Sequence, residues 1–352
     1  MRKLVDIRRG DAVYCPQCGK KKGGGGLVRQ QVLAALDAAR GRYISGQELA
    51  QQLGVSRTAV WKAVTALRAD GTPIEAVTNR GYILHKDTDL LDADAVCALL
   101  KGAAAGLQVE VVQRLPGTNA ALRRQAADGE PEGRVLIAQA QSAGRGRQGR
   151  SFYSPPGGLY MSLLLRPDMA ARQAVQITAM AAVAAARAIR TVCGVQVEIK
   201  WVNDLLYGGK KVCGILTEAS LDLESGMLDY AVLGLGINLV TPLQGWPQEL
   251  SGVAGALYET TPPGGTRAAL AAAVLNEFWA LYTARNHGDF LEEYRRLQIL
   301  PGKQIEVVRP GCEVRSALAL GVDEECRLRV RFEGETAVTA LSSGEARVRE
   351  AE

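Results

Sequence analysis

Three arginines and three glycines lie within residues 143–150, directly after an apolar run that is typical of a strand. The guanidinium groups of Arg145, Arg147 and Arg150 can pair with carboxylate or phosphate oxygens through planar, forked hydrogen bonds. The glycines lower the steric barrier to unusual backbone angles, so amide groups can come close to a ligand. The segment therefore predicts a loop that closes over an anionic ligand. A basic solvated connection, or a non-specific nucleic-acid patch, would use the same residue types.

A lysine stands near the end of another predicted strand, over residues 195–204. The apolar residues of this strand alternate, which places Lys200 on the opposite, polar face. A lysine there can stabilise negative charge as a point charge, although an exposed structural lysine would show the same pattern. Asn203 and Asp204 follow, and both are typical turn residues.

Two further segments have residue types that suit a ligand site. Thr118 and Asn119 stand where a helix begins, so their side chains can cap that helix or contact a polar ligand at its start. The predicted strand over 231–238 contains Gly234 and Gly236. Glycine inside a strand indicates close approach of a ligand or of a neighbouring segment.

Residues 27–86 predict a small domain of helices followed by a hairpin. Ser45 begins a capping box with Glu48, Gly54 stands where that helix ends, and Ser56 can cap another helix two residues later. Two helices joined by so short a turn predict a helix-turn-helix, and the strand-turn-strand pattern after it predicts a wing. The side chains that we expect to face DNA are Ser56, Arg57, Thr58, Trp61, Lys62 and Thr65 on the second helix and Arg80 at the tip of the wing. A helical protein-interaction module is the alternative.

The composition is ordinary for a soluble globular protein of two or three domains. The 352 residues include 42 basic and 37 acidic side chains, and a net charge of +5 is too small to identify a nucleic-acid partner by itself. The N-terminus lacks the apolar run of a signal peptide, and no apolar run approaches the ~18–20 residues that span a bilayer. We therefore expect a cytoplasmic protein with no membrane partner, in which the seven cysteines are reduced.

The order of these patterns divides the chain into five parts. The parts are a flexible tail (1–26), a winged helix-turn-helix DNA-binding domain (27–86), a linker (87–105), a mixed α/β domain with the ligand site (106–300) and a small β-barrel (301–352). Cys15 and Cys18 in the tail form half of a zinc site, but the sequence offers no second half, so we expect no metal site there. The fold class predicted is α+β.

Three motifs in this order resemble those of the biotin protein ligases, namely residues 144–150, 200–204 and 234–238. The winged helix before them, with residues 55–62 and 78–82, resembles that of the bifunctional ligases that also repress the biotin operon. The resemblance covers all but the predicted tail. It implies a central ligase domain similar to class II synthetases and a C-terminal barrel of the SH3-like kind.

The resemblance also implies roles for individual residues. It assigns biotin binding to Gly117, Thr118, Asn119, Gln141, Arg145, Gly146, Arg147 and Lys200. It assigns binding of ATP and of the adenylate to Arg145, Arg147, Arg150, Asn203, Gly236 and Asn238. Lys200 and Arg147 are the expected catalytic residues, because cations can neutralise the charge that builds up when a carboxylate meets a phosphate. Val202 stands where the family usually has proline, and Gly117 where it usually has serine.

The implied reaction has two steps. Biotin and ATP give biotinyl-5′-adenylate and pyrophosphate, and a lysine of a biotin carboxyl carrier protein then attacks the adenylate. That carrier would belong to acetyl-CoA carboxylase or another biotin-dependent carboxylase, and Mg²⁺ would arrive with the ATP phosphates. Operator DNA and a second copy of the chain, when the adenylate is bound, are the other implied partners. A lipoate ligase and a biotin-sensing regulator without ligase activity are the alternatives.

Overall fold

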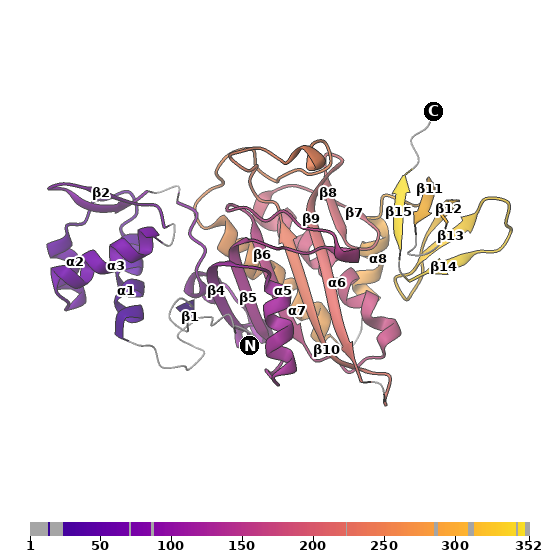
Figure 1. The fold of residues 1–352 in the computed structure, drawn as a ribbon, viewed down its shortest axis with the longest axis horizontal. Helices are drawn as coiled ribbons and strands as arrows, with labels where there is room; N and C mark the ends of the chain where they lie inside the picture. The colour runs from indigo at the N-terminus through magenta and orange to yellow at the C-terminus, as the bar shows by residue number, and fades with distance from the viewer. Residues whose placement is uncertain are drawn as a thin grey trace, which may run out of the picture.

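The computed structural model of the chain describes residues 13–14, 24–69, 72–85, 88–222, 224–284, 288–308, 313–342 and 344–348. Cys15 and Cys18, and most of the predicted tail, lie outside the described residues. A helical module lies at one end of the molecule, a sheet covered by helices lies in the middle, and a smaller sheet lies at the other end (Figure 1).

The N-terminal module has the predicted helix-turn-helix and wing. Its elements are α1 (Gly24–Ala38), α2 (Gly46–Leu53), α3 (Arg57–Ala69), β2 (Ile74–Val77) and β3 (Gly81–Leu84). Ser45 caps α2 by accepting a hydrogen bond of 3.0 Å from the Glu48 amide, and Gly54 ends the helix with a left-handed φ of 65°. Ile44 and Tyr82 exchange backbone hydrogen bonds of 2.9 Å, which fasten the wing to the segment before α2. Helix α1 begins inside the glycine run that we expected to form a flexible joint.

The central sheet has eight strands in the order β1-β4-β5-β6-β10-β9-β8-β7. The strands are β1 (Val13–Tyr14), β4 (Gln108–Leu115), β5 (Arg134–Gln141), β6 (Leu159–Leu165), β7 (Glu198–Lys200), β8 (Asp204–Tyr207), β9 (Lys210–Leu221) and β10 (Leu228–Ile237). Strands β8 and β9 form a tight hairpin, in which Gly208 and Gly209 take positive φ values of 57° and 75°. The strand expected over 195–204 is shorter, because the chain turns after Lys200 and brings β7 into pairing with β8. The peptide bond before Val202, in this turn, is cis.

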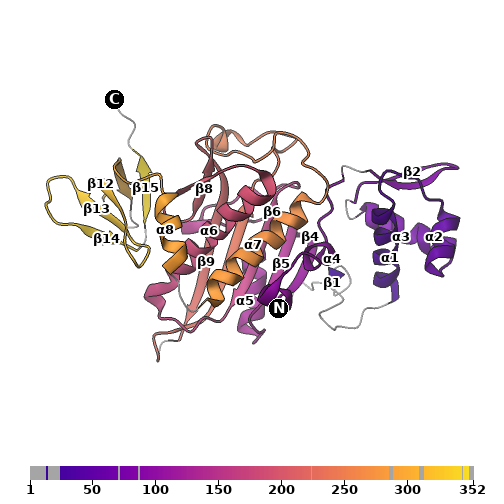
Figure 2. The ribbon, with the colours of Figure 1, turned by 180° about the vertical axis from the view of Figure 1, so that it is seen from behind.

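Helices cover both faces of the central sheet. Helix α5 (Thr118–Ala127) lies on the face seen in Figure 1, and α6 (Ala174–Cys193), α7 (Thr266–Thr283) and α8 (Gly288–Arg296) lie on the face seen in Figure 2. Helix α4 (Ala93–Cys97) and 3-10 turns at Gly102–Gly106, Arg147–Gly149, Ala171–Gln173 and Gln248–Leu250 complete the helical elements of the described residues.

The segment Ala171–Cys193 is long and apolar enough to cross a membrane by length and composition, although we expected no run of that length. Most of it is buried inside the protein. Its alanines let α6 pack closely between the sheet and α7, so this is the pattern of a core helix.

The C-terminal part forms an antiparallel sheet in the order β14-β13-β12-β11-β15. The strands are β11 (Gln304–Val308), β12 (Arg315–Val322), β13 (Leu328–Phe332), β14 (Thr339–Leu341) and β15 (Glu345–Val348). Strands β14 and β15 do not pair with each other among the described residues, so closure into a barrel stays a prediction. One apolar core runs from the central sheet into this sheet, and Trp201 Nε1 donates a hydrogen bond of 3.0 Å to the carbonyl oxygen of Cys326.

Polar contacts fasten the linker on both sides. On the module side, Arg40 Nη1 donates to the carbonyl oxygen of Thr88 at 2.5 Å. On the other side, Arg267 Nε at the start of α7 lies 2.6 Å from Asp89 Oδ2, and both side chains are nearly buried. The module has an apolar core of its own, separate from that of the central sheet.

Candidate ligand site and nucleic-acid interface

The first turn of α5 meets the end of β5 through a chain of hydrogen bonds. The Thr118 amide donates to Gln141 Oε1 at 2.9 Å, and Gln141 Nε2 donates to Ser154 Oγ at 2.9 Å. Ser162 Oγ, from the middle of β6, lies 2.7 Å from Thr118 Oγ1. Because Thr118 and Ser162 are buried, these bonds satisfy groups that water does not reach. Two of the predicted biotin-binding residues, Thr118 and Gln141, are thus held together.

Asn119 has both ends of its carboxamide occupied. Its Nδ2 donates to the carbonyl oxygen of Leu216 at 3.2 Å and to Glu218 Oε2 at 2.9 Å. Its Oδ1 lies 2.6 Å from Ser162 Oγ, which donates to it. A Cβ atom on Gly234 would lie only 2.0 Å from Asn119 Oδ1. Gly234 is therefore required by a protein side chain that approaches the strand.

The ring of Phe152, directly after the arginine-rich loop, packs on the same face of the sheet. A Cβ atom on Gly236 would lie 2.4 Å from this ring, and one on Gly214 would lie 2.9 Å from it. We expected Gly236 to lie behind a bound ligand, and in this structure an aromatic ring occupies that space. A role for Gly236 toward the adenylate stays a prediction.

The arginine-rich loop reaches the turn after β7. Arg147 Nη1 donates to Asn203 Oδ1 at 3.2 Å, and Asn203 Nδ2 donates to the carbonyl oxygen of Ile215 at 2.9 Å. Arg145 and Arg150 are exposed. The structure therefore brings Arg147 and Asn203 together, although 55 residues separate them in the chain, and leaves two other predicted anion-binding arginines accessible.

Lys200 lies on the strand that pairs with β8, directly opposite Asp204. The carboxylate of Asp204 is already engaged, because Lys211 Nζ lies 2.6 Å from its Oδ1. Lys200 makes no hydrogen bond or ion pair with the described residues, and its side chain is half-buried. Of these two neighbouring lysines, Lys200 is therefore the one whose charge is available to a ligand.

Asn238 differs from the other predicted residues because its side chain is buried. Its Nδ2 donates to the carbonyl oxygens of Gly255 at 3.0 Å and Lys211 at 3.3 Å. The side chain thus joins the loop that follows β10 to the start of β9. The predicted contact of Asn238 with ATP remains untested.

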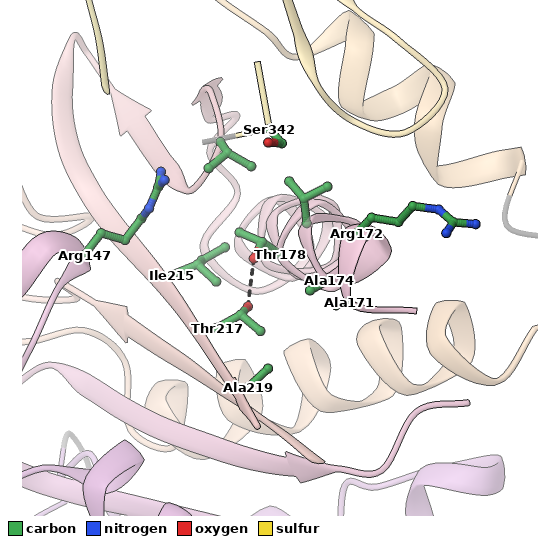
Figure 3. Close-up of a pocket in the computed structure, with 11 residues that line it drawn as sticks. Arg147, Ala171, Arg172, Ala174, Thr178, Ile215, Thr217, Ala219 and Ser342 are labelled. Atoms are coloured by element: carbon green, nitrogen blue, oxygen red, sulfur yellow. Dashed lines mark hydrogen bonds between the residues drawn. The ribbon is translucent and has the colours of Figure 1, made fainter. Parts of the chain in front are cut away.

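A cavity of about 310 Å³ lies on the other face of β9, between that strand and the start of α6 (Figure 3). It is lined by Arg147, Ala171, Arg172, Ala174, Val175, Thr178, Val202, Ile215, Thr217, Ala219 and Ser342. Thr178 and Thr217 share a hydrogen bond of 2.7 Å in its wall. Side chains alternate along β9, so Glu218 and the polar set around Asn119 lie on the opposite face. The residues predicted to bind biotin from α5 and β5 converge on that opposite face.

The buried thiols beside the site are inert. Burial raises the pKa of the Cys213 thiol to about 12, and it raises that of Cys326 to about 12 as well. Neutral thiols are poor nucleophiles, so neither is a candidate for covalent catalysis. Among the described residues, no group of three or more His, Cys, Asp or Glu side chains could hold a metal ion.

The predicted DNA-reading side chains of α3 are exposed. They are Arg57, Thr58, Trp61, Lys62 and Thr65, and none of them forms a hydrogen bond or ion pair with the described residues. Ser56 differs, because its Oγ accepts a hydrogen bond of 3.1 Å from the Ala59 amide and so caps the helix. The face offers donors and a solvent-exposed indole to a partner.

Arg80 in the wing is exposed but not free. Its guanidinium lies 4.1 Å from the centre of the Tyr43 ring. The Tyr43 hydroxyl donates to Glu75 Oε1 at 3.1 Å, and His85 Nε2 lies 2.7 Å from Glu75 Oε2. Hydrogen bonds from His85 and Tyr43 hold the pKa of Glu75 below its ordinary value. The wing is thus fixed by its own polar cluster.

We did not predict three of the residues that shape the site, which are Phe152, Ser162 and Glu218. The sequence carries a signal for Ser162, because it is the one serine inside the otherwise apolar or aromatic, fully buried strand β6. Phe152 and Glu218 had none, since their contacts depend on strands and loops that are distant in the sequence.

Two segments of the chain match known protein families. Residues 111–238 match the Biotin/lipoate A/B protein ligase family, and residues 28–83 match an HTH domain. The chain is 36% identical over 235 residues to the Bifunctional ligase/repressor BirA of Bacillus spizizenii, covering 66% of this chain and 72% of that relative. It is 33% identical over 202 residues to the protein of the same name in Escherichia coli, covering 57% of this chain and 61% of that relative.

Among solved structures, a biotin protein ligase from Aquifex aeolicus in complex with biotin and ATP resembles this fold. Its TM-score is 0.56, and the match covers 69% of this chain and 99% of that chain. At 22% sequence identity this likeness concerns the fold alone.

Proposed function

The chain belongs to the family of bifunctional biotin ligases and repressors, and from this premise we propose how its residues perform both activities. It activates biotin with ATP and transfers the biotinyl group to a lysine of a biotin-dependent carboxylase. It also binds DNA through its winged helix and represses transcription in response to biotin.

The observation that carries the proposal is the meeting of three segments that are distant in the sequence. Gln141 joins the start of α5 to the strand that enters the arginine-rich loop. Arg147 joins that loop to the turn after Lys200. Polar groups suited to a ureido ring therefore lie beside cations suited to a carboxylate and a phosphate, which is the set of contacts that biotin and ATP require together.

In the first step, an oxygen of the biotin carboxylate attacks the α-phosphorus of ATP, and pyrophosphate leaves. We assign biotin binding to Gly117, Thr118, Asn119, Gln141, Arg145, Gly146, Arg147 and Lys200. Lys200 and Arg147 stabilise the negative charge shared between carboxylate and phosphate. Arg150, Asn203, Gly236 and Asn238 contribute to the ATP and adenylate subsite.

In the second step, the amine of the acceptor lysine attacks the carbonyl carbon of the adenylate. The bond to phosphate breaks, AMP leaves, and an amide is formed. We identify the acceptor as a biotin carboxyl carrier protein. The exposed positions of Arg145 and Arg150 support a loop that stays open until the adenylate is present.

We propose that Mg²⁺ enters this site as a companion of the ATP phosphates. When bound, it would supply further neutralisation of phosphate charge. We also propose that the central domain is similar to class II synthetases, that the C-terminal sheet belongs to an SH3-like barrel and that the protein is cytoplasmic.

The DNA-binding half of the proposal rests on the exposed polar face of α3, whose side chains Arg57, Thr58, Lys62 and Thr65 form no hydrogen bond or ion pair with the described residues. We propose that the protein binds operator DNA as a homodimer when the adenylate is bound, which implies two half-sites related by the two-fold axis of the dimer. The N-terminal residues of α3 would lie in the major groove.

The decisive experiment is incubation with labelled ATP, Mg²⁺ and biotin, followed by addition of a carrier domain. We expect biotin-dependent release of pyrophosphate and then label on the carrier lysine. Tight biotin binding without pyrophosphate release would instead identify a regulator that lacks ligase activity. Pyrophosphate release with lipoate but not with biotin would identify a lipoate ligase, a class that the matched family also includes.

A further inference from the structure

Glu218 lies beside the predicted biotin site but belongs to none of the motifs that define it. Its carboxylate bridges two side chains of α5, because Oε2 accepts from Asn119 Nδ2 at 2.9 Å and Oε1 accepts from Arg123 Nη1 at 2.7 Å. We propose that Glu218 is a positioning residue, which fixes the Asn119 carboxamide so that its oxygen faces the biotin ureido ring. This inference rests on the proposed function.

The orientation of the carboxamide follows from the chemistry of its neighbours. An ionised carboxylate and a backbone carbonyl accept hydrogen bonds and cannot donate them. Glu218 and Leu216 therefore both require the NH₂ group of Asn119 on their side. The oxygen must then face the other way, where Ser162 Oγ donates to it at 2.6 Å.

This orientation leaves one specific group for a ligand. Both amide protons of Asn119 are engaged, whereas an amide oxygen accepts two hydrogen bonds and Ser162 provides one. Asn119 therefore presents an acceptor. A ureido ring carries N–H donors, so the fixed oxygen matches biotin and rejects an analogue that has an acceptor atom in place of that N–H.

Arg123 makes the role of Glu218 testable. In the Glu218→Gln variant, the side chain keeps its shape but has one oxygen and one NH₂ group. The Arg123 guanidinium can only donate, so it holds the oxygen of Gln on its side and turns the NH₂ group toward Asn119. This NH₂ group can donate only to the Asn119 oxygen, so it favours the flipped carboxamide. In that orientation the Leu216 carbonyl loses its hydrogen bond from Asn119, and the NH₂ group of Asn119 faces the ligand N–H.

The experiment measures pyrophosphate release as biotin and ATP are varied in turn. We expect Glu218→Gln to raise the KM for biotin about 10- to 100-fold, because an acceptor is replaced by a donor at a desolvated contact. The KM for ATP should stay within about twofold, because the change is confined to the ureido end. Arg123→Ala alone should have a smaller effect on the biotin KM, since Glu218 still orients Asn119.

The double variant Glu218→Gln with Arg123→Ala should recover much of the lost biotin affinity. Without Arg123, the Gln side chain can turn its oxygen back to Asn119. A purely structural role of the carboxylate would make the double variant at least as impaired as Glu218→Gln, and that result would overturn the proposal. An unchanged biotin KM in Glu218→Gln would overturn it too.

A substrate ratio makes the test independent of how much enzyme is folded. The probe is a biotin analogue in which a ring oxygen replaces one ureido N–H. The ratio compared is kcat/KM for biotin divided by kcat/KM for the analogue. This ratio should be high for the wild-type protein and at least about tenfold lower for Glu218→Gln. Glu224→Gln, which removes a charge from the exposed turn after β9, is the matched control and should leave the ratio unchanged.

The two proposals fail in different ways. A wild-type protein that releases no biotin-dependent pyrophosphate would overturn the proposed function, and the inference with it. An active wild type with an unchanged preference in Glu218→Gln would overturn the role of Glu218 alone.

Discussion

The polar side chains around Asn119, in the predicted biotin site, and those of helix α3 are held in opposite ways. Around Asn119, each side chain is bonded to another that lies far away in the chain, so Gln141, Ser162 and Glu218 fix one arrangement. On α3, Arg57 and Lys62 are exposed and make no such contact with the described residues.

The difference corresponds to the two kinds of partner. A small ligand with fixed donors and acceptors is selected by groups that are already oriented before it arrives. DNA is bound first through its phosphates, and long cationic side chains can adjust to them. We therefore expect substitutions in the hydrogen-bonded network around Asn119 to alter stability and function together, and substitutions on α3 to alter function alone.

Lys200→Ala should show the largest effect, because it removes a cation from the reacting groups. We expect the rate of adenylate formation to fall roughly 1000-fold. Since Lys200 has no partner among the described residues, the free energy of unfolding should change by less than about 0.5 kcal/mol. Pyrophosphate release and chemical denaturation measure the two quantities.

The exposed Lys101 provides the matched control, and Lys101→Ala should retain full activity. Normal labelling of a carrier domain by Lys200→Ala would contradict the role of this lysine.

The double variant Arg57→Ala, Lys62→Ala should weaken DNA binding without affecting ligation. Loss of two phosphate contacts should reduce the slope of log affinity against log salt by about 2. Binding titrations at several salt concentrations measure this slope. Arg68→Ala, in the last turn of the same helix, should change it less, because the first residues of a recognition helix enter the groove. An equal change of the salt slope in Arg68→Ala and in the double variant would indicate that DNA contacts a different surface of the module.

Ser162→Ala tests whether one side chain of the network around Asn119 contributes both to the stability of the fold and to biotin binding. The hydroxyl is fully buried between Thr118 and Asn119, so its loss should cost about 1–3 kcal/mol of unfolding free energy. It should also raise the KM for biotin several-fold. The exposed Thr65→Ala on α3 should stay within about 0.5 kcal/mol of wild type. Equal unfolding free energies of Ser162→Ala and Thr65→Ala would contradict the claim that the network around Asn119 contributes to stability and the face of α3 does not.

The smallest expected effect concerns the polar cluster of the wing. Unlike the side chains of α3, the wing residues are bonded to one another, although they belong to the DNA-binding module. Because the pKa of Glu75 is lowered by hydrogen bonds from His85 and Tyr43, the folded state favours its charged form. The contribution of Glu75 to the free energy of unfolding is present when the pH is above the ordinary glutamate pKa of about 4.3. It is lost as the pH falls through the lower pKa that Glu75 has in the folded state. Carboxyl titration by NMR should give a midpoint below about 4.3, and a midpoint above it would argue against the cluster.

The sequence predicted those parts of the fold that depend on neighbouring residues. Ser45, Gly54 and Ser56 act through capping and turn geometry, and the helices of the module begin and end where these residues predict. Gly208 and Gly209 likewise identify the hairpin. Local rules of this kind need no knowledge of the rest of the chain.

The remaining features depend on contacts between distant segments. Ser162 and Glu218 matter only because β6 and β9 place them beside the first turn of α5. The pairing of Asp89 with Arg267 depends in the same way on where α7 begins. The resemblance to the family predicts Thr118, Asn119, Gln141, Arg147 and Asn203 as site residues. The structure adds one set of hydrogen bonds that joins the first three and another that joins Arg147 to Asn203.

The two ends of the molecule are attached to the ligase domain by different kinds of contact. The C-terminal sheet shares one apolar core with it, and Trp201, next to Lys200, is bonded to that sheet through Cys326. The N-terminal module keeps its own core and is joined through a few polar contacts of the linker. In evolutionary terms, a gene could gain or lose the module and leave an intact enzyme, whereas the C-terminal sheet must be inherited with the active site it supports.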